Sequence, residues 1–274
     1  MSLAKFKIMK GRFIDSLKCS LAGLRDLFFT RNCAVCGGTL EADERLLCGK
    51  CLGDIPLTYF WNYSENAAME TLGGHSGCHV HNAAALFFYR HESPYCEIVR
   101  QFKYGRQETL GLWAARLLGS YLACGGLYGD VQAVVPVPLH WRKRWRRGFN
   151  QAEIIARGVA EKLGDRGVAI SAGDSDDGGA TAKGTRGGFL VEPNLLRRRR
   201  YTSTQTRRGA SSRRQNVHGV FALNPRATAR LKKAGVRHIL LVDDVMTTGA
   251  TLAECIRLLQ DHFTVSVATL GFVE

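Results

Sequence analysis

The chain has 274 residues, 45% of them hydrophobic and 23% charged, so it is long enough to bury a substantial core. Its formal net charge of +14 at pH 7 points to an anionic ligand or partner. No apolar run reaches the roughly eighteen residues that a membrane-spanning helix needs, and the composition predicts a globular protein of the cytoplasm.

Residues 1–30 predict an amphipathic helix. A signal peptide is not expected, because charged residues interrupt the apolar stretch that should follow the basic start of the chain. We expect this helix to pack on the body of the protein, with contact to anionic lipid as the alternative and no stable membrane insertion. The apolar residues at helical spacing are Phe13, Leu17, Leu21, Leu24 and Phe28.

Two pairs of cysteines follow, Cys33-x-x-Cys36 and Cys48-x-x-Cys51. Four thiolates at this spacing complete a tetrahedral zinc site, and the sequence therefore predicts a zinc-binding module over residues 31–58. Two disulfides are the alternative, disfavoured because the cytosol keeps thiols reduced. A site with four thiolates has no open position for a substrate, so the predicted role of the zinc is structural.

A second cluster, with His75, Cys78, His79 and His81, lies in a glycine-rich stretch. Its spacing matches no established ligand set. We expect a solvated loop here, with a second metal site as the alternative.

The middle of the chain alternates predicted strands and helices. A basic turn, residues 103–106, separates the first two helices. Asn150 opens the third helix, with Glu153 placed as in a capping box. Strands are predicted at 83–88 and at 131–137, where Pro136 and Pro138 end the strand, and helices at 95–102, at 110–122 and from 150 onward.

The second half begins with a different composition. Residues 165–188 are rich in Gly, Ser, Asp and Thr, and predict a flexible insertion. The basic segment 197–214 follows, and then the elements resume: strands at 217–223, 239–242 and 265–272, and helices at 228–233 and from 252 to 259. Alternating strands and helices predict an α/β fold with a mainly parallel sheet.

The most informative stretch is 239–251, Ile-Leu-Leu-Val-Asp-Asp-Val-Met-Thr-Thr-Gly-Ala-Thr. A buried strand, paired carboxylates, a loop of hydroxyl and glycine residues and a helix start together describe a sugar-phosphate site. The helix start offers N–H groups to an anion, Gly249 permits close approach, and Asp243 with Asp244 accepts hydrogen bonds from vicinal sugar hydroxyls. An acidic pair alone also fits a metal site, a phosphate acceptor or a helix cap.

The positive charge is concentrated in two segments. Residues 142–147 hold five basic residues and residues 197–214 hold eight arginines, with no acid in either. The other 25 of the 38 basic residues nearly balance the 24 acidic residues. The net positive charge therefore comes from these two segments. A phosphate-rich small ligand explains part of the excess. A nucleic acid explains it as well, through phosphate contacts and stacking on nearby aromatic residues, which are Trp141, Trp145, Phe149 and Tyr201.

The 239–251 stretch resembles the binding motif for phosphoribosyl pyrophosphate (PRPP) of type I phosphoribosyltransferases, and the whole chain resembles the ComF family. The motifs that carry the resemblance occur in order along the chain: Cys33 to Cys51, Val135-Pro136-Val137-Pro138-Leu139, Arg147-Gly148-Phe149-Asn150-Gln151, Thr204-Gln205-Thr206, Arg214-Gln215-Asn216-Val217, Gly219-Val220-Phe221 and the stretch at Asp243. The resemblance implies a zinc module followed by a type I phosphoribosyltransferase-like domain over residues 80–274.

The resemblance also implies roles for individual residues. Asp243 and Asp244 would bind the ribose hydroxyls, and magnesium would accompany the pyrophosphate of PRPP. The 5-phosphate would be wrapped by Thr247, Thr248, Gly249, Ala250 and Thr251. A pyrophosphate loop would hold Pro138, Leu139 and His140. A mobile flap over the site would carry Arg200, Tyr201, Thr204, Gln205 and Arg214.

Three functions are compatible with these residues. The first is a phosphoribosyltransferase that acts on an unidentified acceptor. The second is a protein that handles single-stranded DNA, alone or with competence-machinery proteins, since the resemblance to ComF implies a link to natural competence and DNA uptake. The third is an adaptor that senses PRPP or a nucleotide and keeps the binding loop without turnover. No base pocket is recognisable, so the sequence does not name the acceptor.

Overall fold

The computed structural model describes residues 31–105, 107–139, 145, 148–168, 189–199 and 219–274. The chain divides into two compact units, Met1–Ile55 and Pro56–Glu274, which are described separately. The predicted N-terminal helix over residues 1–30 lies outside the described residues.

The described part of the smaller unit is built around its cysteines. An isolated bridge between Asn32 and Thr39 closes the first cysteine pair into a tight turn, in which Gly37 has a φ of +74°. The short helix α2 (Gly49–Gly53) carries the last cysteine, Cys51. Backbone hydrogen bonds, and not a large apolar core, hold this arrangement.

The larger unit is centred on a five-stranded sheet whose neighbouring strands all pair in parallel. This confirms the predicted α/β class with a mainly parallel sheet. The continuous apolar run of residues 239–242 is fully buried, as expected for a central strand covered on both faces. In spatial order the strands are β1 (Ala83–Phe88), β7 (Thr264–Phe272), β6 (His238–Met246), β2 (Ala133–Pro136) and β3 (Leu190–Val191).

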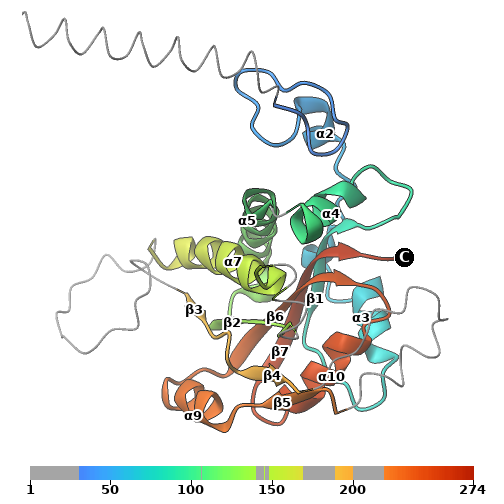
Figure 1. Ribbon diagram of the computed structural model, residues 1–274. Helices are drawn as coiled ribbons and strands as arrows, with labels where there is room; N and C mark the ends of the chain where they lie inside the picture. Colours follow the sequence, from blue (N-terminus) through green and yellow to red (C-terminus); the bar gives the residue numbers. More distant parts are fainter. Residues whose placement is uncertain (1–30, 106, 140–144, 146–147, 169–188, 200–218) are drawn as a thin grey trace, which may run out of the picture. The chain divides into compact units, whose positions relative to one another are not determined.

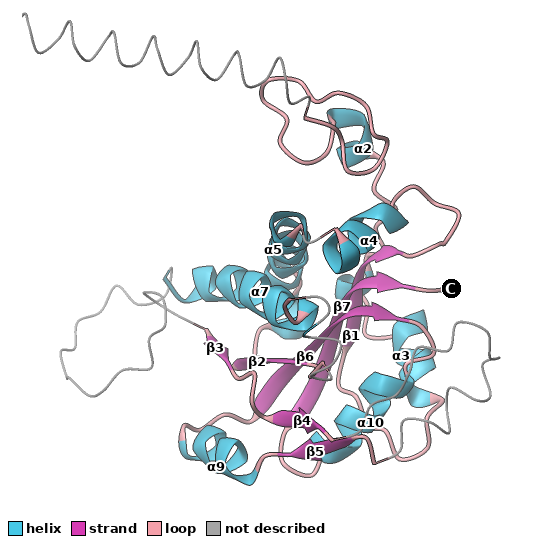
Figure 2. Ribbon diagram, in the orientation of Figure 1, coloured by secondary structure: helices cyan, strands magenta, loops and turns pink. Residues whose placement is uncertain are grey.

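Helices cover both faces of this sheet (Figure 1). The helices α5 (Glu108–Cys124) and α7 (Gln151–Val168) pack against each other on one face, and α4 (Cys96–Tyr104) packs on α5. The helices α3 (Ala67–Gly73) and α10 (Ala250–Leu259) lie on the other face (Figure 2). Glycines let α5 and α7 approach closely, because a Cβ on Gly119 would lie 2.9 Å from the Cα of Val159.

A smaller layer stands beside α10. It consists of the antiparallel pair β4 (Leu196–Arg198) and β5 (Phe221–Leu223), followed by α9 (Pro225–Lys233). Two short 3-10 helices, η1 (Phe60–Asn62) and η2 (Gly126–Tyr128), complete the described elements.

Several predicted boundaries were wrong. Helix α7 runs to Val168, so residues 165–168 are helical and not part of a flexible insertion; an ion pair of 2.9 Å between Lys162 and Asp165 supports this last turn. Residues 169–188 lie outside the described residues. Lys103 and Tyr104 form the end of α4, where a turn was predicted. Strand β6 continues past the acidic pair to Met246, because β7 pairs with it as far as Phe272.

Candidate functional site

The loops that follow β6 and β2 lie side by side at the carboxyl edge of the sheet. From β6 the chain crosses through α10 to β7, and from β2 it crosses through α7 to β3, so the two crossovers leave in opposite directions and cover opposite faces (Figure 1). Such a switch point opens a crevice in which α/β proteins bind ligands. The N–H of Val137, just after β2, donates to the carbonyl of Val242 over 2.9 Å.

The predicted phosphate loop occupies one side of this crevice. Gly249 has a φ of +70° and is the N-cap of α10, and Ala250 and Thr251 form the first positions of that helix. Thr247 is exposed and Thr248 half-buried. Unpaired N–H groups and the helix dipole make such a start favourable for an anion.

Helix α3 packs directly behind this loop. A Cβ on Gly249 would lie 3.1 Å from Cδ2 of Leu72, 3.3 Å from Cγ2 of Thr71 and 3.4 Å from Nε2 of His75. The positive φ and the crowding together require glycine at this position. The loop is therefore fixed from behind by a segment that the sequence did not assign to any element.

The two carboxylates in the second half of β6 are half-buried and close together. The N–H of Asp244 donates to Oδ1 of Asp243 over 2.8 Å. Burial raises the pKa of Asp243 to about 7, with the charge of Asp244 acting in the same direction, while that N–H and the cations Lys103 and Arg198 oppose the shift. Asp243 therefore gains and loses its proton near neutral pH.

Two cations at this site come from other elements. Nζ of Lys103, at the end of α4, lies 3.0 Å from Oδ2 of Asp244, and both side chains are mostly buried, 20% and 16% exposed. Arg198, on β4, lies over the ring of Phe221 at 5.2 Å; burial lowers its pKa and the charge of Asp243 raises it. Neither was predicted to act with the acidic pair. Only the packing of α4 and β4 brings them there.

The predicted pyrophosphate loop lies on the β2 side of the crevice. Pro138 and Leu139 are half-buried, and His140 lies outside the described residues. Asn150 ties this loop to α7, because its Nδ2 donates to the carbonyl of Val137 over 3.3 Å. Its Oδ1 accepts from the N–H of Ala152, so Asn150 does cap the helix.

The aromatic residues near residues 142–147 divide into two kinds. Phe149 packs against Phe102 of α4, with ring centroids 5.8 Å apart, so it supports the crevice and is not a free stacking platform. Trp145 is 87% exposed. Trp141 and Tyr201 lie outside the described residues.

The predicted flap residues Arg200, Tyr201, Thr204, Gln205 and Arg214 also lie outside the described residues. The two ends of their segment are described. Arg199 donates from its N–H to the carbonyl of Val220 over 2.7 Å, and the N–H of Gly219 donates to Oε1 of Glu254 on α10 over 2.7 Å. The segment thus begins and ends on β4, β5 and α10, beside the crevice.

The cluster of His75, Cys78, His79 and His81 lies in a loop in which His79 and His81 are exposed, as expected, but the loop is also tied to the body of the larger unit. Cys78 is buried, and Nε2 of His75 lies 2.6 Å from the carbonyl oxygen of Thr248. Three further hydrogen bonds tie the loop to Arg257 of α10 and to Gln260, the C-cap of that helix. The four residues do not gather around a common point, since the one metal-compatible group found among the described residues is that of the four N-terminal cysteines.

Those four cysteines do converge. The Sγ atoms of Cys33, Cys36, Cys48 and Cys51 all lie within 4.8 Å of one another, which is compatible with one tetrahedral zinc ion. Burial disfavours the Cys33 thiolate, but N–H groups that point at it, including that of Cys48, outweigh this and lower its pKa to about 6. Burial and the neighbouring thiols raise the pKa of Cys51, so their surroundings alone do not ionise all four thiols, and zinc itself stays a prediction.

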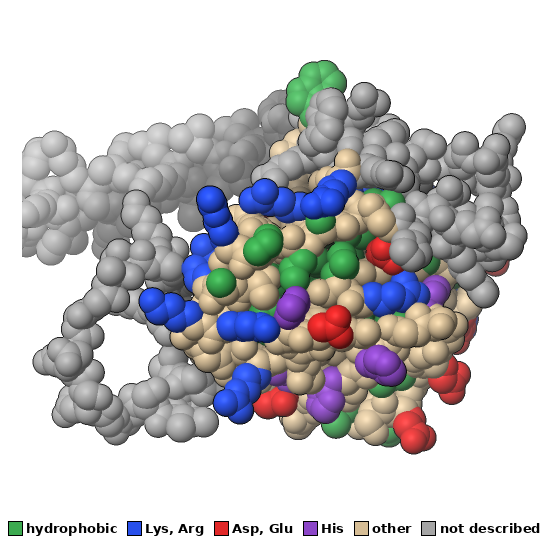
Figure 3. Space-filling view, turned by 90° about the horizontal axis from the view of Figure 1, so that it is seen from below, with side chains coloured by type: hydrophobic (Ala, Val, Ile, Leu, Met, Phe, Trp, Pro, Cys, Tyr) green, Lys and Arg blue, Asp and Glu red, His purple; other side chains and the backbone are tan. Residues whose placement is uncertain are grey.

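Helix α9 presents a basic face that the sequence analysis did not single out. Residues 225–237 contain five basic residues and no acid, and all five are exposed. They are Arg226, Arg230, Lys232, Lys233 and Arg237. Arg197 and Arg199 on and beside β4 are exposed as well. Figure 3 shows Lys and Arg side chains gathered on the side of the molecule where α9 lies.

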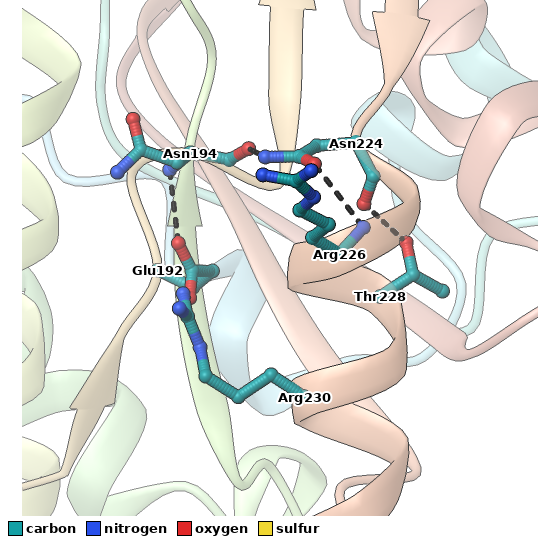
Figure 4. Close-up of polar contacts among 6 residues, drawn as sticks. All are labelled: Glu192, Asn194, Asn224, Arg226, Thr228 and Arg230. Carbon is teal, nitrogen blue, oxygen red and sulfur yellow. Dashed lines mark hydrogen bonds and ion pairs between the residues drawn. The ribbon is translucent and has the colours of Figure 1, made fainter.

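A polar network holds α9 in place (Figure 4). The side chain of Asn224 caps the helix at the N–H of Arg226 and donates to the carbonyl of Asn194 over 3.0 Å. Arg230 pairs with Glu192, whose side chain is buried. The basic face therefore stands on a fixed helix.

Comparison with known proteins identifies relatives over most of the chain. The chain is 26% identical to the "Competence protein F" of Haemophilus influenzae over 245 residues, which cover 85% of this chain and 92% of that protein. It is 31% identical to the "DNA utilization protein YhgH" of Salmonella typhimurium and 29% identical to that of Escherichia coli K12, in each case over 61% of both chains. No protein-family model matches the chain. None of its described helices is both long and apolar enough to cross a membrane.

Proposed function

We propose that this protein, a member of the ComF family, binds PRPP together with magnesium in the crevice at the carboxyl edge of the sheet. The observation that carries the proposal is the convergence at one switch point of the acidic pair, the start of α10 and the loop after β2. A ligand with vicinal hydroxyls between two phosphate groups matches these three features.

Each part of the site has a chemical task in this proposal. Asp243 and Asp244 accept hydrogen bonds from the ribose hydroxyls. The N–H groups at the start of α10 bind the 5-phosphate. Lys103, held beside Asp244, adds positive charge where the pyrophosphate would otherwise meet two carboxylates. Magnesium accompanies the pyrophosphate with few direct protein ligands.

We further propose that the bound PRPP is a phosphoribosyl donor. The bond from ribose C1 to the pyrophosphate oxygen breaks through an oxocarbenium-like state, and the electron pair leaves with the pyrophosphate. An acceptor then bonds to C1. The protein positions the reactants and stabilises the departing charge. The acceptor is unidentified, and binding without transfer, as in a sensing adaptor, is the competing form of the same proposal.

The binding proposal is tested by replacing both acids, Asp243→Asn with Asp244→Asn. Two charge-assisted hydrogen bonds are lost, so we expect PRPP affinity to fall by about 100-fold or more in calorimetry with magnesium. Zinc content and folding should not change. The matched control, Asp54→Asn with Asp261→Asn, removes two exposed acids and should bind normally. Unaltered affinity in the first variant would reject the site.

The same calorimetric titration, repeated with a panel of bases and nucleotides, separates binding from turnover. A compound whose addition causes both heat and the release of pyrophosphate would be identified as the acceptor. Tight PRPP binding without pyrophosphate release for any acceptor would favour the sensing adaptor.

A second candidate function is binding of single-stranded DNA. It is supported by the exposed basic face of α9 and by the printed names of the relatives, which refer to competence and to DNA utilization. Arg230 is paired with Glu192, and the four other exposed cations suit the repeating phosphates of a nucleic acid.

A further inference from the structure

The loop between α3 and β1 places an imidazole against the backbone of the proposed phosphate loop. Nε2 of His75 lies 2.6 Å from the carbonyl oxygen of Thr248, a residue far away in the sequence. A carbonyl oxygen only accepts hydrogen bonds, so Nε2 must carry the proton and donate it. His75 contacts the loop itself.

This hydrogen bond fixes the orientation of one peptide plane. The peptide between Thr248 and Gly249 is planar and trans, so its C=O and its N–H point in opposite directions. With the carbonyl directed at His75, the N–H of Gly249 points away from α3. A flipped peptide would instead turn the carbonyl oxygen to the side that faces away from α3, where its dipole would repel an anion. Glycine at position 249 permits such a flip more easily than other residues, so the orientation needs a restraint.

The restraint is itself fixed to α10. Nε of Arg257 donates to the carbonyl of Ser76 over 2.9 Å, and Nε2 of Gln260 donates to the carbonyl of Gly77 over 2.9 Å. Nη1 of Arg257 also pairs with Glu254 over 3.0 Å. The helix whose N-terminus would face the ligand therefore holds the loop that carries His75, and the two cannot shift independently.

We infer that His75 is a positioning residue that holds the N–H of Gly249 toward the 5-phosphate of a phosphorylated ribose. The inference rests on the proposed function, because that function supplies the ligand. His75 acts through the peptide and does not contact the phosphate. Both its neutral and its protonated ring can donate from Nε2, so the hydrogen bond forms in either state.

The first test replaces the imidazole. His75→Ala should weaken binding of PRPP and of ribose 5-phosphate by roughly 3- to 10-fold in calorimetry with magnesium, the effect of one hydrogen bond. Binding of inorganic pyrophosphate should be unchanged. His75→Gln keeps an N–H donor at similar reach and should restore most of the affinity. The control His79→Ala removes an exposed ring of the same loop and should have no effect.

The second test asks how His75 acts. At pH 8 the ratio of wild-type to His75→Ala affinity should stay above one, because the neutral ring keeps its Nε2–H donor. A ratio that falls to one at pH 8 and rises only as the pH falls would mean that His75 acts through the charge of its ring, which overturns the positioning role. Nitrogen-15 NMR of the ligand-free protein should show His75 as the Nε2–H tautomer, and the Nδ1–H tautomer would contradict the hydrogen bond.

Different results would reject the proposed function and the role of His75. If the wild-type protein binds neither PRPP nor ribose 5-phosphate, the proposed function is rejected. If it binds both and His75→Ala binds them equally well with unchanged thermal stability, the inference about His75 is rejected and the proposed function stands.

Discussion

Asp243 shows how a single residue combines a stability cost with a binding role. Its carboxyl group is half-buried beside a second acid, and its pKa rises from 3.8 to about 7. A ligand that supplies hydroxyl donors and a cation would relieve this cost on binding. In the ligand-free protein this cost lowers the free energy of unfolding.

This cost predicts a pH dependence. Because the pKa of Asp243 is higher in the folded than in the unfolded state, its stabilising contribution is complete below about pH 4 and is lost as the pH rises through about 7. Asp243→Asn removes the ionisation, so its advantage over the wild-type protein in free energy of unfolding should be larger at pH 8 than at pH 5. We expect a difference of roughly 1–2 kcal/mol, allowing for partial solvent screening.

Urea unfolding of the ligand-free protein at both pH values measures this difference. Asp261→Asn, on an exposed turn, serves as the control and should follow the wild-type profile. If Asp243→Asn follows it too, the carboxyl group is better solvated than its burial indicates.

At the scale of the element, α9 carries the most distinctive surface. Its inner side is buried through Ala227, Thr228 and Leu231, and its outer side carries only basic charges. Arg230 is partly neutralised by Glu192. Arg226 and Lys233 are exposed, and they are the best residues for a test because their replacement leaves the buried ion pair intact.

Arg226→Gln with Lys233→Gln should weaken binding of a single-stranded oligonucleotide and lower the slope of log affinity against log salt by about 1.4, the value expected for two lost phosphate contacts. Fluorescence anisotropy at several salt concentrations measures both quantities. The control Arg90→Gln with Arg116→Gln removes two cations from other elements and should leave the slope unchanged. Equal slopes in both variants, or binding only to anionic vesicles, would reject α9 as the DNA-binding face.

At the scale of the whole molecule, the two compact units should depend on metal differently. The described part of the smaller unit has little apolar core, and a structural metal supplies folding free energy to such modules. We expect a strong chelator to remove one zinc ion per chain and to unfold the smaller unit. The larger unit, with its own sheet and core, should stay folded and keep its PRPP affinity.

Metal analysis, hydrogen exchange of residues 31–55 and calorimetry with PRPP together test this expectation. Cys36→Ala, which removes an exposed ligand, should reproduce the effect of the chelator without any chelator present. Unchanged hydrogen exchange after complete metal loss would show that the module does not need its metal to fold.

Features that depend on a local pattern could be predicted from the sequence. The buried run 239–242, the alternation of strands and helices, and the two cysteine pairs each predicted an element or a class that the structure contains. These signals are local, because an apolar run, a hydrophobic period and a residue spacing can each be recognised within a short stretch of consecutive residues. Boundaries were less certain, since the pairing of β6 with β7 extended a strand that propensity alone would have ended at Val242.

Which distant residues come into contact depends on the packing of the whole fold. Lys103 looked like part of a turn, Arg198 like one of eight arginines and His75 like a loop residue, yet the first two lie at the acidic pair and the third at the phosphate loop. Their positions follow from how α3, α4 and β4 pack around the carboxyl edge of the sheet. No local pattern in a single sequence encodes contacts between segments so far apart, because they arise from the packing of whole elements.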